Sequence, residues 1–299
     1  METFLQALPH GITLSCRSTG VRGRPVLMFL HGFPEGAFIW DGVMAHFALP
    51  ENGAYRCVAP NLRGFERSSA PEDAKAYRAK FLVQDIAALI QAEGGELECL
   101  VAHDWGGAVA WNLANQLPQL THKLAIINSP HPGTFLRELK TSAKQRSASA
   151  YMNFLIRPDA EELLTQDDYR RLWEFFTAMG ASSGPHAWLD DAVKQQYREL
   201  WAHGLTGGCN YYRASPLRPT RADDDAAASI DLPQSMFTID LPTLVIWGLN
   251  DTALPPELID GLDAYIPRLT LKTVADASHW IVHEQPALVM RLLGEFLSA

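Results

Sequence analysis

The sequence has few cysteines, no long apolar segment and no basic run, and each of these absences excludes a class of protein. The four cysteines among 299 residues include no Cys-x-x-Cys pair, so we expect neither a zinc nor a redox site. No apolar run is long enough to span a bilayer. Because the net charge is −9, neither nucleic acid nor an anionic membrane is an expected partner.

Two further features concern the compartment of the protein. The N-terminal residues lack a basic segment followed by an apolar core, so no signal peptide is expected. Cys57 and Cys99 lie within apolar runs and are predicted to be buried, unreactive thiols. Together these features favour a reducing cytoplasm as the location.

The chain does contain short apolar runs that alternate with helical segments, the pattern of an α/β fold. Continuous apolar runs fit the strands of a parallel sheet covered on both faces. The predicted strands of this kind are 26–30, 97–102, 123–128 and 243–248, and two further strands are predicted at 55–59 and 269–274. Residues 11–17 alternate in polarity and are predicted to form an edge strand. The predicted core helices are 38–47, 79–93 and 283–297.

Residues 134–236 differ from the rest because they contain no strand-like apolar run and are dense in aromatic side chains. Helices are predicted at 134–156, 160–179 and 187–204, with a linker at 214–233. An all-helical insertion in an α/β sheet is typical of a lid over an active site. The predicted units are therefore a first core part (1–133), a helical lid (134–236) and a second core part (237–299).

The segment 96–112 predicts a sharp turn from a strand into a helix, with Asp104 at its tip. Gly106 and Gly107 follow and allow the helix to pack against neighbouring backbone. This pattern resembles a nucleophile elbow in which aspartate replaces serine and Ala102 replaces the first glycine. The alternative is that Asp104 only caps the helix.

Three titratable residues follow three predicted strands: Asp104, Asp251 and His279. Their order along the chain is nucleophile, acid, histidine, which is the order of the triad in α/β-hydrolases. A glycine-containing turn after strand 26–30 adds the backbone N–H of Phe33, which we expect to form an oxyanion hole with that of Trp105. By contrast, His131 lies between two prolines and is predicted to be structural.

Six motifs resemble those of the α/β-hydrolase superfamily and, within it, of the epoxide hydrolases. They are His31-Gly-Phe-Pro-Glu35, His103-Asp-Trp-Gly-Gly107, Ser129-Pro-His-Pro132, Asn210-Tyr-Tyr-Arg213, Gly248-Leu-Asn-Asp251 and Ser278-His-Trp280. The resemblance implies an α/β-hydrolase fold with a mostly parallel sheet, helices on both faces and a helical lid. The chain departs from the family pattern at Glu66, where glycine is usual.

The resemblance also implies that two lid tyrosines hydrogen-bond the epoxide oxygen. The second of these matches Tyr212, whose neighbour Tyr211 is the alternative, and the first matches Tyr151, although Ala150 replaces the aromatic residue that often precedes it. Further residues are expected in the substrate pocket, namely His31, Pro34, His103, Phe154 and Trp280.

The chemistry of an aspartate nucleophile agrees with this reading. A carboxylate can displace a leaving group at a saturated carbon and form an ester with the substrate. An epoxide oxygen then needs a proton, which a tyrosine hydroxyl can supply. His279, held by Asp251, would activate the water that cleaves the ester. The expected reaction converts a small apolar epoxide and water to a vicinal diol, with no metal or organic cofactor.

Two other functions remain open at this point. A dehalogenase would use the same aspartate, with Trp105 as a halide donor. However, haloalkane dehalogenases carry a motif similar to His-Gly-Asn-Pro at the first turn, where this chain has Phe33 in place of asparagine. Fluoroacetate dehalogenases have an acidic residue at the end of the strand after the elbow, where this chain has Asn128. A non-catalytic binding protein on this fold is the other alternative, because a fold does not imply a function. A serine-type esterase is not expected, since no serine occupies the elbow.

Overall fold

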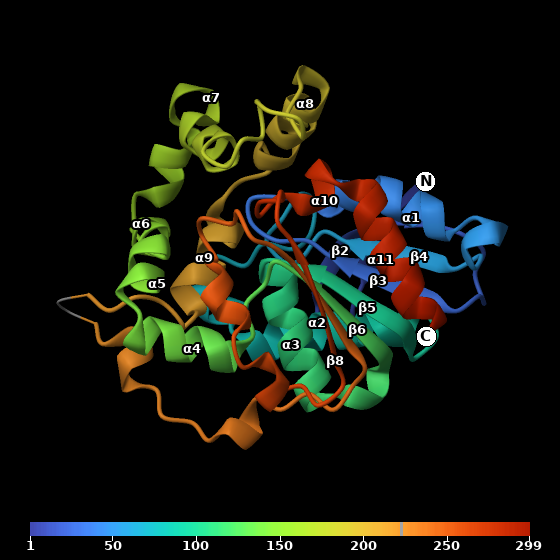
Figure 1. The fold of residues 1–299 in the computed structure, drawn as a ribbon. Coiled ribbons are helices and arrows are strands. Elements are labelled where there is room, and N and C mark those ends of the chain that lie inside the picture. Colours follow the sequence, from blue (N-terminus) through green and yellow to red (C-terminus); the bar gives the residue numbers. More distant parts are fainter. Residues whose placement is uncertain (222–223) are drawn as a thin grey trace.

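The computed structural model describes residues 1–221 and 224–299, and its core is one eight-stranded sheet (Figure 1). The strand order is β1-β2-β4-β3-β5-β6-β7-β8. The first two strands run antiparallel to their neighbours, whereas the pairs from β4 through β8 are parallel. The prediction of a mostly parallel sheet is confirmed.

The six predicted strands between residues 26 and 274 are present with small shifts at their ends, and the last of them is largely exposed. Residues 11–17, predicted as an edge strand, instead contribute to a strand that pairs on both sides, so that prediction was wrong. The true edge strand was missed because most of its residues are exposed and carry little apolar signal. The strands are β1 (Glu2–Ala7), β2 (Thr13–Thr19), β3 (Val26–Leu30), β4 (Arg56–Pro60), β5 (Leu97–His103), β6 (Thr121–Ile127), β7 (Thr243–Gly248) and β8 (Leu269–Val274).

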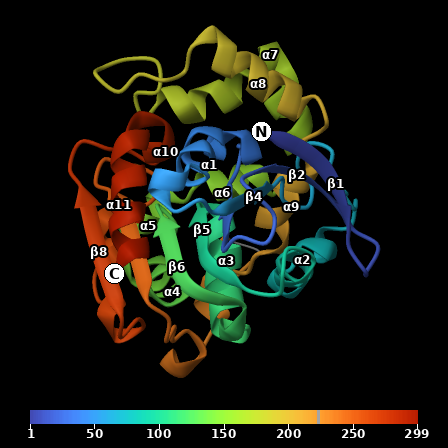
Figure 2. The same cartoon turned by 90° about the vertical axis from the view of Figure 1, so that its right-hand side faces the viewer.

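Helices cover both faces of the sheet, as the views in Figures 1 and 2 show. Successive side chains of a strand point to opposite faces. In β3, Phe29 therefore packs towards α1 and α11, whereas Met28 packs towards α2 and α3. These helices are α1 (Asp41–Phe47), α2 (Ala79–Ala92), α3 (Trp105–Gln116) and α11 (Pro286–Ser298).

The predicted closing helix, 283–297, is interrupted. A short helix, α10 (Ile281–Glu284), ends before Gln285, and α11 begins at Pro286. Proline has no N–H to continue the helical ladder and disfavours helical dihedrals in the residue before it. Gln285 accordingly has non-helical dihedrals, with φ −137° and ψ 56°.

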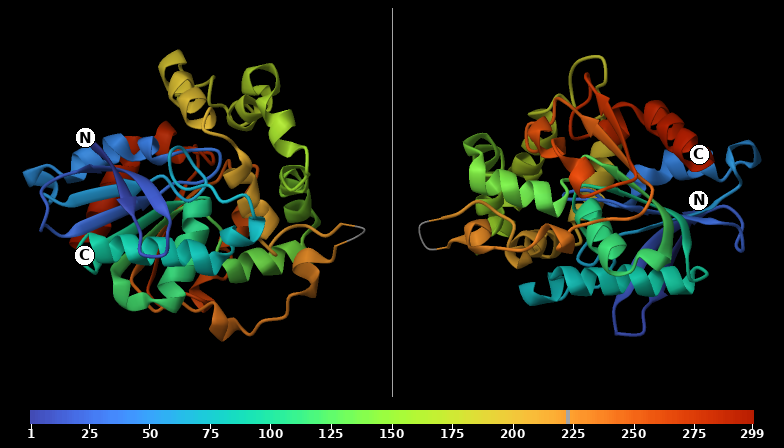
Figure 3. Two further views of the ribbon diagram at one scale, coloured as in Figure 1. Left: turned by 180° about the vertical axis from the view of Figure 1, so that it is seen from behind. Right: turned by 60° about the horizontal axis from the view of Figure 1, so that its bottom comes forward.

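The segment between β6 and β7 consists of helices and loops. Within its described residues, none joins the eight-stranded sheet, although Arg221 and Asp224 form an isolated bridge. Figures 1 and 3 show these helices on one side of the core. That residues 134–236 form a lid over the active site remains a prediction. They are α4 (Pro132–Thr141), α5 (Ala143–Ala148), α6 (Tyr151–Leu155), α7 (Ala160–Thr177), α8 (Asp191–Trp201) and α9 (Thr206–Ala214).

Helix boundaries in this segment differ from those predicted. The single helix expected over 134–156 is divided at Ser142, whose side chain caps α5 by accepting from the Gln145 N–H. Helix α9 was missed because Gly207 and Gly208 lower helix propensity. Gly207 is required for close packing, since a Cβ there would lie 2.3 Å from the Cα of Gly64.

All four cysteines are buried and unpaired by disulfides, which confirms the prediction for Cys57 and Cys99. In the part of the chain that is described, no helix is long and apolar enough to cross a membrane. The same residues contain no group of three or more His, Cys, Asp or Glu side chains arranged to hold a metal ion.

Candidate active site

Asp104 lies at the tip of the turn between β5 and α3, with φ 49° and ψ −122°. Such dihedrals are strained for a residue other than glycine and occur mainly at functional sites. The side chain makes no capping bond to α3. Its Oδ1 instead accepts a hydrogen bond of 2.8 Å from the N–H of Phe33. The alternative that Asp104 only caps the helix is therefore wrong.

Close backbone packing forms this turn. A Cβ on Gly106 would lie 2.6 Å from the carbonyl oxygen of Leu30, and one on Gly32 would lie 2.2 Å from Oδ1 of Asp104. The hydroxyl of Ser129 donates to the Asp104 carbonyl at 2.6 Å and fixes the turn from the other side. The elbow thus holds the carboxylate beside the Phe33 N–H, while the contribution of the Trp105 N–H remains a prediction.

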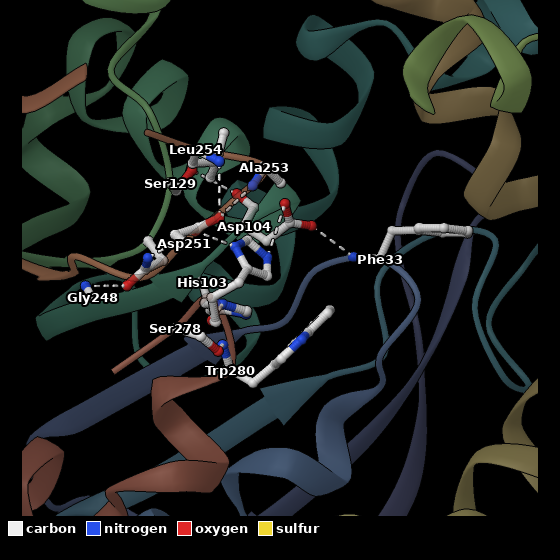
Figure 4. A network of polar contacts seen from close by, with 12 residues as sticks. Phe33, His103, Asp104, Ser129, Gly248, Asp251, Ala253, Leu254, Ser278 and Trp280 are labelled. Atoms are coloured by element: carbon white, nitrogen blue, oxygen red, sulfur yellow. Dashed lines mark hydrogen bonds and ion pairs between the residues drawn. The ribbon is translucent and has the colours of Figure 1, made fainter. Parts of the chain in front are cut away.

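His279 lies between the two predicted carboxylates and is buried. Its Nδ1 is 2.7 Å from Oδ2 of Asp251, and its Nε2 is 3.7 Å from Oδ2 of Asp104. Figure 4 shows Asp104, Asp251 and Phe33. Its dashed lines mark the hydrogen bonds and ion pairs between the residues drawn, including the bond from the Phe33 N–H to Asp104. Burial acts to lower the pKa of His279, but attraction to Asp251 and then Asp104 outweighs it and raises the pKa to about 9.

Asp251 is fixed by donors on both of its oxygens. Its Oδ1 accepts from the N–H groups of Ala253 and Leu254 at 2.9 and 2.8 Å. Its Oδ2 accepts from the Asn128 side chain at 2.9 Å, and Asn128 in turn accepts from the Gly248 N–H. From the sequence, Asn128 is only a difference from dehalogenases, and its positioning role was missed. The sequence shows only that Asn128 follows a predicted strand; that this strand lies next to the strand preceding Asp251 is known from the structure.

A second buried polar cluster lies behind His279 and was also missed. His103 Nε2 is 2.8 Å from the His279 carbonyl oxygen, and its Nδ1 is 3.1 Å from Glu35. Glu35 also contacts His283 and the Tyr197 hydroxyl, each at 2.8 Å. Burial acts to raise the pKa of Glu35, but hydrogen bonds with His103 and His283 prevail and hold it well below its usual range. Tyr197 belongs to α8, so the cluster connects the helical insertion to the loop that carries His279.

Tyr151 and Tyr212 come from α6 and α9, and their ring centroids lie 6.0 Å apart. The ring of Tyr212 packs edge-on against Trp105 at 5.0 Å and Phe33 at 5.5 Å. Desolvation is the largest cause that raises the pKa of each tyrosine, and the negative charge of Asp104 adds to it. Both hydroxyls therefore keep their protons at neutral pH and can act as donors.

Tyr211 differs from Tyr212 in the direction of its hydroxyl, which donates to the carbonyl of Arg63 at 3.0 Å. That hydroxyl is already engaged with the core. The geometry therefore favours Tyr212 over Tyr211 as the donor that faces Asp104.

An apolar cavity of about 250 Å³ joins these groups, since Asp104, Trp105, Tyr151 and Tyr212 all line it. Four of the five predicted pocket residues line neither this cavity nor a second one nearby, namely His31, Pro34, His103 and Trp280. Phe154 lines the second cavity, of about 300 Å³.

The prediction for those four residues is corrected, because each supports the site from behind. His103 is the last residue of β5, and its ring contacts Glu35 and the His279 carbonyl instead of the cavity. The ring of His31 accepts from the Leu62 N–H, and the carbonyl of Pro34 accepts from Trp201. Trp280 packs against the His279 ring at 4.7 Å. As predicted, His131 is structural: it caps α4 and contacts the Phe237 carbonyl.

Comparison with known proteins places this geometry in a family. A family model described as the alpha/beta hydrolase fold matches residues 25–286. The AB hydrolase superfamily protein YfhM of Bacillus subtilis is 35% identical over 96% of this chain and 95% of its own length. Epoxide hydrolase 4 of Mus musculus is 30% identical over 98% of this chain and 79% of its own length. The crystal structure of Bacillus megaterium epoxide hydrolase with an inhibitor superposes with a TM-score of 0.89, at 29% identity, covering 99% of this chain and all of that one.

Proposed function

The chain belongs to the α/β-hydrolase fold family and, within it, to the epoxide hydrolases, and from that premise we propose that it opens an apolar epoxide to a vicinal diol through an ester on Asp104. The observation that carries this proposal is one cavity lined by the carboxylate of Asp104 and by Tyr151 and Tyr212, two of its four lining tyrosines. Behind that carboxylate, His279 lies between Asp104 and Asp251.

The first step is attack by Asp104 on one carbon of the epoxide ring. Its Oδ1 is held by the Phe33 N–H, so Oδ2 is the oxygen that forms the new bond. The carbon–oxygen bond of the ring breaks, and its electron pair moves to the epoxide oxygen. A hydroxyl of Tyr151 or Tyr212 hydrogen-bonds that oxygen and donates its proton as the alkoxide forms.

The second step is hydrolysis of the ester by water. Formation of the ester removes the negative charge of Asp104, which helps to raise the pKa of His279, so this pKa falls when the ester forms. Neutral His279 then takes a proton from water through Nε2, and the hydroxide attacks the carboxyl carbon. Oδ1 becomes an oxyanion beside the Phe33 N–H, with the Trp105 N–H as the proposed second donor. The bond from that carbon to Oδ2 breaks, and the diol leaves with Oδ2 and a proton from His279. The regenerated carboxyl group of Asp104 carries the water oxygen as a hydroxyl, and its proton returns to the tyrosinate left by the first step.

The cavity supports an apolar substrate, because its walls include Leu82, Val109, Phe135 and Met152. Polar residues are a minority of this lining and include Asp104, Tyr151 and Tyr212, as in sites that orient an apolar ligand by a small number of hydrogen bonds.

The test is incubation of the purified protein with styrene oxide, followed by chiral analysis of the diol. We expect the diol from the wild type and none above background from Asp104→Ala. A set of haloalkanes in the same assay detects dehalogenase activity by halide release. Halide release without diol formation would contradict the proposal and favour a dehalogenase, and binding without turnover of either class would favour a binding protein.

A further inference from the structure

Helix α8 docks on the turn that follows β3 (residues 32–36, called the β3 turn below). Its three buried residues are Tyr197, Leu200 and Trp201, at positions i, i+3 and i+4, a spacing that places side chains on one face of a helix. Leu200 lies against Gly36, where a Cβ would be 2.9 Å from one of its methyl carbons. The helical insertion therefore contacts the β3 turn through the buried face of α8.

Trp201 begins a chain of three hydrogen bonds that ends at the carboxylate of the elbow. Its indole N–H donates to the Pro34 carbonyl at 2.7 Å. The N–H of the same peptide unit belongs to Glu35 and donates to the Gly32 carbonyl at 3.0 Å. The peptide unit of that second carbonyl carries the Phe33 N–H, which donates to the carboxylate at 2.8 Å, as Figure 4 shows. Two peptide units thus connect a side chain of the insertion to the expected oxyanion donor.

This arrangement affects both the direction and the strength of the Phe33 N–H. Each peptide unit is planar, so a bond that holds its carbonyl also fixes the direction of its N–H. Hydrogen bonds in series polarise one another, because a peptide whose carbonyl accepts a bond becomes a better donor through its N–H. Trp201 is 3% exposed, so little water reaches its indole N–H to compete with the Pro34 carbonyl.

We propose that Trp201 is a positioning residue for the hydrolysis step, because its bond to the Pro34 carbonyl aligns and polarises the Phe33 N–H that stabilises the oxyanion. This proposal rests on the function proposed for Asp104 and extends it to a residue that lines neither cavity. The docked position of α8 then contributes to the chemistry itself.

The two half-reactions should respond differently to loss of the Trp201 bond. Attack on the epoxide removes negative charge from Asp104, so a donor at Oδ1 stabilises the free carboxylate more than the transition state. Attack of hydroxide on the ester builds negative charge on Oδ1, so the same donor lowers that barrier. Removal of a complete oxyanion donor lowers kcat by about 10² to 10³. Because the Phe33 N–H remains and loses only its support, we expect a smaller loss, about tenfold in the rate constant of hydrolysis.

The experiment follows the ester on Asp104 during single turnovers of styrene oxide, with enzyme in excess, by rapid quench and intact-protein mass spectrometry. The rise of the ester gives the rate constant of alkylation, its decay gives that of hydrolysis, and its peak fraction reports their ratio. In Trp201→Phe we expect hydrolysis to slow about tenfold while alkylation does not slow. Benzothienylalanine in place of Trp201, with sulfur instead of the indole N–H, should give the same result at preserved ring size. It decides the matter if Trp201→Phe does not fold.

Trp173→Phe is the matched control. Trp173 packs against Trp201, with 4.5 Å between ring centroids, and its indole N–H also donates to a backbone carbonyl, that of Asp168 at 2.7 Å. That carbonyl belongs to α7 and not to the β3 turn. The variant therefore loses the same kind of donor from the same aromatic cluster, and its ratio of the two rate constants should equal that of the wild type.

The outcomes separate the positioning role from packing and from the reaction itself. An unchanged ratio in the folded Trp201 variants, whether both rate constants fall together or neither changes, would overturn the positioning role and leave the function proposed for Asp104 intact. The same change of ratio in Trp173→Phe would also overturn it, because packing within the cluster would then be the cause. Absence of both ester and diol in the wild type would instead contradict the proposed function.

Discussion

Asp251→Asn should separate the two half-reactions, because the hydrogen bonds around this side chain leave it one orientation. The N–H groups of Ala253 and Leu254 both point at Oδ1, so the amide oxygen of the new asparagine must stay there. Its NH2 group then occupies the place of Oδ2, 2.7 Å from Nδ1 of His279 and 2.9 Å from the donating amide of Asn128. This NH2 group then faces the NH2 group of Asn128, so two donors oppose each other there. It also faces Nδ1 of His279, which must therefore act as the acceptor.

The consequence is a histidine with its proton on the wrong nitrogen. With Nδ1 accepting, the proton lies on Nε2, facing Asp104, and Nε2 can no longer take a proton from water. The same substitution also removes the attraction that does most to raise the pKa of His279. A wrong tautomer in a Ser-His-Asp triad lowers kcat by about 10⁴, and we expect a loss of about 10³ to 10⁴ here. Alkylation of Asp104 should change far less, since that step needs no base.

The assay combines rapid-quench measurement of the first turnover of styrene oxide with steady-state rates, and thermal unfolding checks that the variant is folded. We expect a burst of epoxide consumption equal to the enzyme concentration, followed by very slow diol release. Equal loss of both steps, or a kcat within tenfold of the wild type, would refute the tautomer argument.

Two other outcomes test the lid tyrosines and the charge of the histidine. Tyr151→Phe and Tyr212→Phe should each slow alkylation at least about tenfold by deleting one donor to the epoxide oxygen. Tyr211→Phe should leave the alkylation rate unchanged, because the Tyr211 hydroxyl donates to the Arg63 carbonyl. Rapid-quench measurement of the alkylation rate in the three variants tests this. The folded-state pKa of His279, about 9, lies above its reference value, so its protonation stabilises the fold fully below pH 6.5, and this contribution is lost as the pH rises through 9. The difference in unfolding free energy between wild type and His279→Gln should therefore shrink by about 3 kcal/mol between pH 6 and pH 10 in denaturant titrations, whereas a constant difference would contradict the raised pKa.

The sequence carried enough information to predict the sheet and the order of the triad. Buried parallel strands appear as continuous apolar runs, and Asp104 and Asp251 follow such runs closely, whereas His279 follows the predicted strand 269–274 after a short loop. Chain order and strand ends are local features, so they can be read without knowledge of tertiary contacts. The same reasoning failed for β1, which is largely exposed, and for α9, whose two glycines serve a close contact with Gly64.

Contacts between distant residues could not be predicted in this way. Asn128 supports Asp251 from 123 positions away, and Glu35 meets His283 across 248 positions. The expected pocket residues lie in or beside the site motifs along the chain, but nearness in sequence does not give the direction of a side chain. His103 is the clearest case, because it supports the carbonyl of His279 instead of the substrate.

The ester on Asp104 is the central claim, and intact-protein mass spectrometry of His279→Gln tests it most directly. This variant keeps the nucleophile but cannot activate water, so incubation with styrene oxide should add the mass of the whole epoxide, on the peptide that contains Asp104. Asp104→Ala should gain no mass under the same conditions. Absence of any adduct in a His279→Gln protein that is folded and binds ligand would contradict the account and indicate that Asp104 does not act as a nucleophile.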